Sequence, residues 1–76
     1  MSGIYTVSQL SKQTYNIIDA EKGTIVNRLI LQDGEALSGP IVVGDRCTFI
    51  VKTGPSQQFG VIYSLPKGTI INKFPA

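Results

Sequence analysis

Short apolar and β-branched runs alternate with Gly, Pro and Asp along most of this chain. Runs of about five to eight residues between such turn formers are typical of β-strands. Six strands are predicted, over Thr14–Asp19, Thr24–Leu31, Ile41–Val43, Arg46–Thr53, Gln58–Ser64 and Thr69–Phe74. The pattern therefore predicts an all-β fold, a small single-domain clip, barrel or sandwich of about six short strands.

The N-terminal segment departs from this pattern. Thr6 and Gln9 have the spacing of a helix capping box, with Val7 and Leu10 as the apolar positions. An irregular arm is the equally open alternative. We therefore expect residues 1–13 to form an N-terminal arm or short helix, and residues 14–76 to form the all-β domain.

An arm of this composition would be adhesive. We expect it to add a strand to the sheet edge of a neighbouring subunit, so that removing residues 1–10 leaves the fold and abolishes docking. The candidate partner-binding residues of this segment are Ile4, Tyr5, Val7 and Leu10.

One segment of the chain occurs twice. Lys22–Leu29 returns as Lys67–Phe74, with five identical positions and three conservative exchanges. In the second copy Pro66 presets the turn and Gly68 closes it. The repeat predicts two equivalent turns that each launch a strand, and hence internal pseudo-symmetry.

Period-two alternation places one asparagine among the apolar residues of each repeated strand. It groups Ile25, Asn27 and Leu29 on one face, and Ile70, Asn72 and Phe74 on the matching face. Each asparagine either marks a bulge or bonds a backbone group, or it hydrogen-bonds a partner. The partner hypothesis adds four candidate residues, Asn27, Arg28, Asn72 and Lys73.

Composition points to association. Of the 76 residues 42% are hydrophobic and 16% charged, with a net charge of +2. One cysteine and no histidine provide neither an internal disulfide nor an ordinary zinc site. Because so small a domain is marginally stable alone, this apolar surplus predicts a homo-oligomer.

The chain has no secretory signal and no apolar run long enough to span a bilayer. We expect a complete small gene product with no membrane partner. Its expected location is the virion if a phage encodes it, and otherwise the cytoplasm.

The sequence has few of the residues and motifs that catalysis requires. Histidine, the commonest general base, is absent, and no nucleophile elbow or phosphate-binding loop occurs. All carboxylates lie in or beside predicted turns, where solvation and local hydrogen bonds explain them: Asp19, Glu21, Asp33, Glu35 and Asp45. We predict no enzyme activity, no catalytic or metal-binding residue and no cofactor.

Nucleic-acid binding is the alternative function. Small β-barrels bind single-stranded DNA or RNA by stacking bases on aromatic rings along a basic groove. Arg46, Lys52, Phe59 and Tyr63 are the residues that would form such a face.

The segment Leu65-Pro66-Lys67-Gly68-Thr69-Ile70-Ile71 resembles the turn-strand of β-clip proteins. It is similar to the turn-strand of antifreeze-like (SAF) domains and to the Gly-Thr-Val/Ile segments of bacteriophage head-decoration proteins. With Lys22–Leu29, the resemblance covers about a quarter of the chain. It implies a compact clip of short strands, and the decoration proteins imply trimers that sit on capsid surfaces through an N-terminal arm.

The function expected from the sequence is therefore structural. The chain should be a small self-assembling virion or capsid accessory protein of the decoration type, which binds itself and a larger shell or scaffold subunit. The alternative is a small β-barrel that binds single-stranded nucleic acid or acts as a regulator.

Overall fold

The computed structural model describes residues 3–32 and 34–76, so Asp33 and the first two residues of the expected arm lie outside it. The described residues form eight strands and no helix. Three strands make sheet A in the order β1-β2-β3, and five make sheet B, in which β4-β6-β7-β8 run side by side and β5 also pairs with β6. The strands are β1 (Tyr5–Gln9), β2 (Thr14–Asp19), β3 (Thr24–Ile30), β4 (Glu35–Ala36), β5 (Ile41–Val43), β6 (Arg46–Lys52), β7 (Gln58–Ser64) and β8 (Thr69–Pro75).

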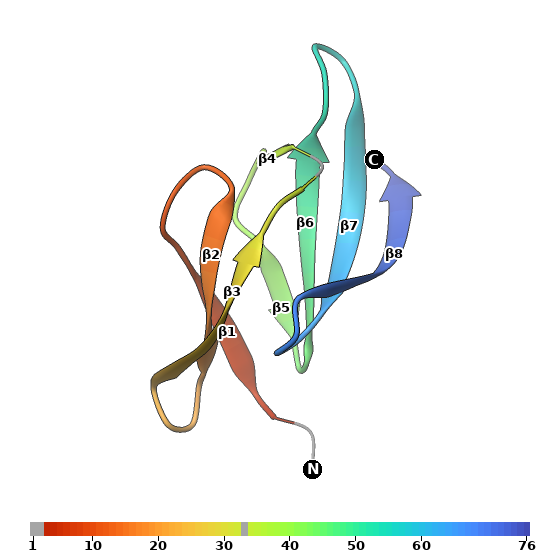
Figure 1. Cartoon of the computed structure of the whole chain (residues 1–76). Coiled ribbons are helices and arrows are strands. Elements are labelled where there is room, and N and C mark those ends of the chain that lie inside the picture. Colours follow the sequence, from red (N-terminus) through yellow and green to blue (C-terminus); the bar gives the residue numbers. More distant parts are fainter. Residues whose placement is uncertain (1–2, 33) are drawn as a thin grey trace.

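The two sheets pack against each other with a single core between them (Figure 1). Three aromatic rings join the sheets in this core. Tyr15 of sheet A lies 4.8 Å from Phe49 of sheet B, and Phe49 meets Tyr63 edge-on at 5.8 Å between ring centroids. Such tilted pairs add about 0.5–1.5 kcal/mol each beyond the burial of their area.

The all-β class is confirmed, and the predicted strands agree closely with those observed. Three have the predicted bounds, and the other three differ by one residue at one end, for example β3, which ends at Ile30. The alternation of apolar residues missed β1 and the two-residue β4. β4 is too short to show a period. β1 does alternate apolar and polar residues, but Thr6 and Gln9 also have the capping-box spacing that favoured a helix.

The prediction of a short helix near the N-terminus is wrong. Residues 5–9 form β1, which pairs with β2 along its whole length from Tyr5↔Asp19 to Gln9↔Tyr15. Tyr5 and Val7 pack against the core, so β1 belongs to the body of the fold. Deletion of residues 1–10 would therefore remove a core strand, because the sandwich uses this segment itself.

The repeated sequence is a repeated structure. In each copy the glycine N–H closes the turn on the last residue of the preceding strand, from Gly23 to Asp19 O at 2.7 Å and from Gly68 to Ser64 O at 2.8 Å. Both glycines have positive φ, +70° and +75°, which favours glycine over any other residue.

The similarity extends beyond the turns to a whole three-stranded unit. The residue that follows β2 or β7 donates its N–H to the residue that precedes β1 or β6. Ala20 donates to Ile4 O at 2.9 Å, and Leu65 donates to Asp45 O at 2.7 Å. β1-β2-β3 and β6-β7-β8 are thus two copies of one meander, which accounts for the pseudo-symmetry.

A β-bulge in each copy corrects the predicted side-chain faces. The register shifts between Ile17 and Ile18, so that Ile17 faces Asn27 while Ile18 faces Ile25. Ile25 and Asn27 therefore lie on opposite faces of β3, not on one face as simple alternation predicts. The shift between Ile62 and Tyr63 has the same effect in β8.

The asparagines stabilise these bulges, as one of the two sequence hypotheses proposed. Asn27 Oδ1 accepts a hydrogen bond from the Arg28 N–H at 2.8 Å, and Asn72 Oδ1 accepts one from the Lys73 N–H at 2.9 Å. The local bond is thus the same in both copies.

The buried thiol predicts a pH dependence of stability. Burial raises the pKa of the Cys47 thiol from its ordinary 9.0 to about 12. Because the unfolded chain then releases the thiol proton first, the free energy of unfolding should fall as the pH rises from about 9 towards 12 and should be independent of this group below that window. Urea denaturation across this range measures the slope, and Cys47→Ala should flatten it. An equal slope in both proteins would contradict the assignment.

Candidate interaction surface

The two meanders pack through unlike faces. We call the side of each hairpin that carries its asparagine the asparagine face. In sheet A this face includes Ile17, Asn27 and Leu29. Ile17 and Leu29 are fully buried in the core, and Asn27 lies exposed at its margin. The counterpart of this face in sheet B lies 45 positions later, with Ile62, Asn72 and Phe74. That face points outward, because the neighbouring Val61 and Tyr63 fill the core.

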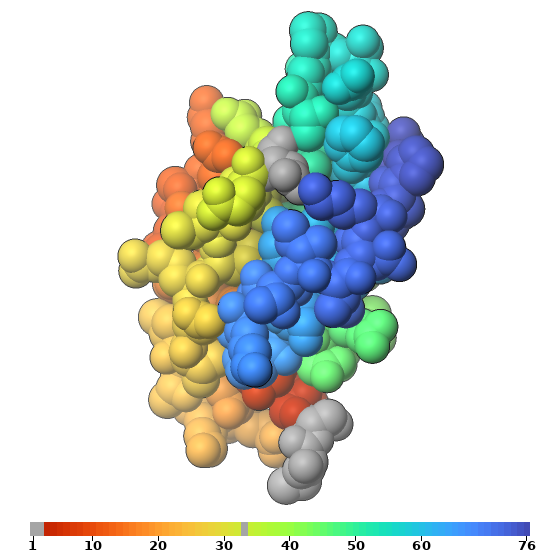
Figure 2. All heavy atoms as spheres, turned by 45° about the vertical axis from the view of Figure 1, so that its right-hand side comes forward, coloured from red at the N-terminus to blue at the C-terminus, as the bar shows by residue number. Residues whose placement is uncertain are grey.

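The asparagine face of sheet A is covered by the turn between β7 and β8. Asn27 Nδ2 donates to Pro66 O at 3.0 Å and lies 3.2 Å from Lys67 O. A Cβ on Gly68 would lie 3.5 Å from a methyl group of Leu29 and 3.7 Å from one of Ile17, so the glycine fits closely on these side chains. In Figure 2 the blue atoms of this turn lie against the gold atoms of β3.

The asparagine face of sheet B has no such cover. Asn72 Nδ2 bonds no acceptor among the described residues. Phe74 is 39% exposed, although its ring lies over Gly60, where a Cβ would collide with it. Every residue of β8 is exposed, as expected for an edge strand with nothing beyond it.

Aliphatic residues extend this open area across the outer face of sheet B. Ile41 and Val43 of β5 pair with Thr48 and Arg46, whose side chains point outward, and they are 64% and 71% exposed. The outer face of sheet B thus carries five large apolar residues, Ile41, Val43, Ile50, Ile62 and Phe74. The green atoms of β5 and the dark-blue atoms of β8 lie on the same side in Figure 2.

Two shallow concavities lie elsewhere. One, of about 310 Å³, is formed by Val7, Gln9 and Tyr15 with the 36–40 loop. The other, of about 450 Å³, holds one carboxylate and one ammonium group, Glu35 and Lys52. Among residues 3–32 and 34–76, no group of three potential metal ligands comes together.

The sequence-predicted partner residues do not form one patch. Ile4 and Leu10 are exposed near opposite ends of β1, whereas Tyr5 and Val7 pack on the core. The remaining four, Asn27, Arg28, Asn72 and Lys73, divide between the edge strands of the two sheets. Of the eight, Asn72 lies on the open asparagine face.

The residues predicted to bind nucleic acid are also separated. Arg46 and Lys52 lie at the two ends of β6 with their side chains on the outer face. Phe59 pairs with the buried Val51, which places it on the inner side, and Tyr63 is only 2% exposed. No basic groove with both rings along it results.

Sequence reasoning missed Ile41, Val43, Ile50 and Ile62 as surface residues. Alternation correctly groups Cys47, Phe49 and Val51 apart from Thr48 and Ile50. Alternation does not determine which of the two apolar faces of β6 is buried in the core. No signal in the sequence decides this, because both faces of β6 carry apolar residues.

The asparagine pair offers a matched test of the internal contact. Asn27→Ala should lower the free energy of unfolding by about 1–2 kcal/mol, since it removes the bonds to the 65–68 turn as well as the local one. Asn72→Ala removes only the local bond and should cost clearly less. Urea denaturation of dilute protein measures both. Equal losses would show that the bonds to Pro66 and Lys67 contribute nothing.

Comparison of the chain with protein-family models, with curated proteins and with solved structures found no match. The resemblance to β-clip proteins therefore stays a prediction. The described residues also include no helix long and apolar enough to cross a membrane.

Proposed function

We propose that this protein is a non-enzymatic structural protein that associates with itself and with other protein subunits, in the manner of a capsid accessory protein. The observation that carries this proposal is the aliphatic outer face of sheet B. Side chains such as Ile41 and Val43 of β5 are more than half exposed on this face, and β8 at the other edge of the sheet pairs with β7 alone.

Large contiguous apolar patches are uncommon on monomeric proteins and mark interaction sites. Burying such surface contributes about 25 cal/mol for each Å² removed from water. This gain is large for a chain of 76 residues, whose own core holds only ten buried apolar residues among those described. Association would therefore stabilise the fold as well as build the assembly.

The chemistry of the face favours a protein partner over nucleic acid. Its centre is aliphatic, and its basic groups, Arg46 and Lys52, lie at opposite ends of β6. Base stacking along a basic groove needs accessible rings beside the basic groups, but Tyr63 is buried, and Phe59, although 38% exposed, lies on the side of sheet B opposite to Arg46 and Lys52. Aliphatic side chains without a basic groove match another protein surface instead.

The assignment to a virion rests on the resemblance of Leu65–Ile71 to phage decoration proteins. It is tested by mass spectrometry of purified particles formed from the genome that encodes the chain. We expect the protein there as a regular component. Its absence from particles, despite expression in the same cells, would contradict this part of the proposal.

Self-association is tested by a pair of substitutions on exposed positions. Ile41→Lys with Val43→Lys should raise the dissociation constant at least about tenfold, because charges would replace apolar contacts. Leu10→Lys is the matched control, since Leu10 is 53% exposed and directly follows β1 in sheet A. Sedimentation equilibrium over a wide concentration range measures the mass of each protein.

Two outcomes would contradict the proposal. A wild-type protein with the mass of one chain at every concentration would exclude self-association. A double variant that associates as the wild type does would exclude this face. Tight, salt-dependent retardation of a single-stranded oligonucleotide in a gel shift would favour the nucleic-acid alternative.

A further inference from the structure

The internal contact between the two meanders shows what fits an asparagine face. The turn Leu65–Gly68 lies on the asparagine face of sheet A, held by the Asn27 amide and by the fit of Gly68 on Leu29 and Ile17. Both partners of this contact are parts of the repeated unit. Each therefore occurs a second time in the chain, 45 positions away.

The second turn of this kind, Ala20–Gly23, is uncovered. Its four residues are exposed, and a Cβ built on Gly23 would meet nothing within 4 Å. Its own N–H groups are satisfied, since Asp19 Oδ1 accepts from Glu21 and Lys22 at 3.0 Å each. No described donor bonds the carbonyl groups of Glu21 and Lys22, the counterparts of Pro66 and Lys67.

The second asparagine face is equally open. Its Asn72 amide has a free donor among the described residues, and Phe74 and Ile62 stand where Leu29 and Ile17 stand in sheet A. Leu29 and Ile17 are at most 1% exposed under their turn, whereas Phe74 is 39% exposed. The chain therefore has one turn seated on one asparagine face, which is the filled contact. It also has a second turn and a second asparagine face that are both open, and these are the two unfilled halves of the same contact.

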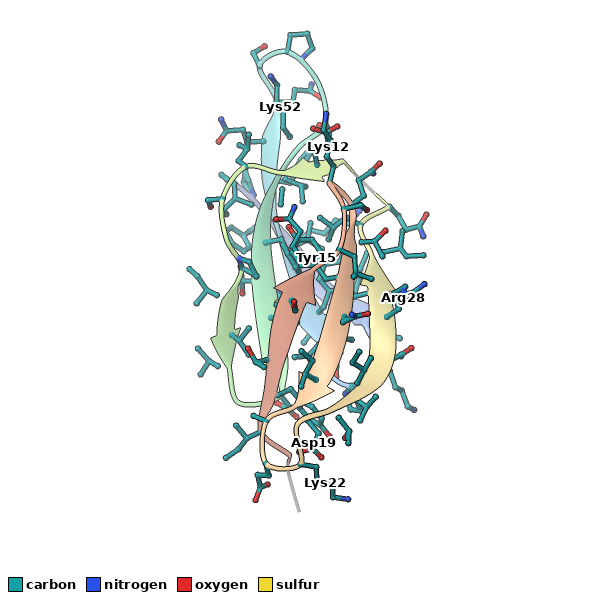
Figure 3. All side chains as sticks on the ribbon, turned by 90° about the vertical axis from the view of Figure 1, so that its left-hand side faces the viewer. Lys12, Tyr15, Asp19, Lys22, Arg28 and Lys52 are labelled. Atoms are coloured by element: carbon teal, nitrogen blue, oxygen red, sulfur yellow. The ribbon has the colours of Figure 1, made fainter. Side chains whose placement is uncertain are left out.

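These two halves cannot meet within one chain. The Ala20–Gly23 turn lies at one end of sheet A, where Figure 3 shows Asp19 and Lys22, and β8 lies at the far edge of sheet B in Figure 1. The Leu65–Gly68 turn and the asparagine face of sheet A, by contrast, are packed against each other within the chain. A second copy of the chain can supply the missing partner to each half.

We propose that copies of this protein join head to tail, with the Ala20–Gly23 turn of one copy seated on the asparagine face of sheet B in the next. Asn72 Nδ2 then donates to the carbonyls of Glu21 and Lys22, and Gly23 lies against Phe74 and Ile62. This inference rests on the proposed function, because it uses the outer face of sheet B as the surface of self-association.

The outward side of sheet A completes the contact. It carries Ile25 and Ile30, which are 62% and 52% exposed, and these lie on the same sheet as the docking turn. They would cover the aliphatic outer face of sheet B, as sheet B covers sheet A within one chain. Since the two halves are different surfaces, the contact is heterologous and builds a ring or a filament.

Asn72→Asp tests the donor. The aspartate keeps the oxygen that accepts the Lys73 N–H bond, but it loses the amide donor and places a carboxylate against carbonyl oxygens. We expect about a tenfold or larger rise in the dissociation constant of self-association, with the urea midpoint of dilute protein little changed. Asn27→Asp is the matched control, which should instead lower that midpoint.

Ala20→Glu tests the turn from the other side. Its counterpart Leu65 is only 4% exposed in the filled contact, so a carboxylate at position 20 should prevent docking. Ala20 is exposed, and the substitution should leave the monomer folded. Ala20→Leu should tighten the association, because it makes this turn resemble the one that is already seated.

Mixing the two weakened variants gives the decisive result. At a concentration where Asn72→Asp and Ala20→Glu are each monomeric, their equimolar mixture should form a dimer and nothing larger in sedimentation velocity. One variant supplies an intact face and the other an intact turn, so a single contact forms.

The failures of the two proposals are distinguishable. Association that Ile41→Lys with Val43→Lys abolishes, but that Asn72→Asp and Ala20→Glu leave unchanged, would overturn the head-to-tail contact and leave the proposed function standing. A mixture that stays monomeric would also overturn the contact. A wild-type protein that is monomeric at every concentration would overturn both.

Discussion

The structure depends on one packing constraint: two copies of the same hairpin share a single core, and only one of them turns its asparagine face inward. Sheet A buries Ile17 and Leu29 on that face, while sheet B fills the core from its opposite side with Val61 and Tyr63. The aromatic contact of Tyr15 with Phe49 closes the interior between them. The open apolar face of sheet B follows from this constraint, because the residues that suit a core in one copy have no sheet above them in the other.

The repeat supplies stabilising local structure to a 76-residue chain whose single cysteine allows no internal disulfide. A turn closed by a positive-φ glycine, a bulge and an asparagine bond are formed twice from nearly the same residues. Local preferences and the final fold then agree in both halves, which favours one native state. The cost is an exposed edge at β8 that carries Ile70, Ile71 and Phe74, and such an edge is a template for pairing with another chain.

Much of this fold could be predicted from the sequence, because β-branched runs and turn residues are local signals. Six strands were placed within one residue, and a bulge at each asparagine was one of the two hypotheses that the sequence offered. The N-terminal strand was mistaken for a helix or arm, since the capping-box spacing of Thr6 and Gln9 competes with its short alternation and its pairing with β2 is a tertiary property. The exposed face on β5 and β6 depends on which side of sheet B meets sheet A, and no local pattern determines that choice.

The most direct test of this account is hydrogen exchange of the two asparagine side-chain amides, followed by NMR in dilute and in concentrated protein. The account predicts that the Asn27 amide is protected at both concentrations, because its partners lie in the same chain. The Asn72 amide should exchange freely in dilute protein and become protected as the concentration rises. Equal protection of the two amides in dilute protein, or an Asn72 amide that stays unprotected in an associated sample, would contradict it.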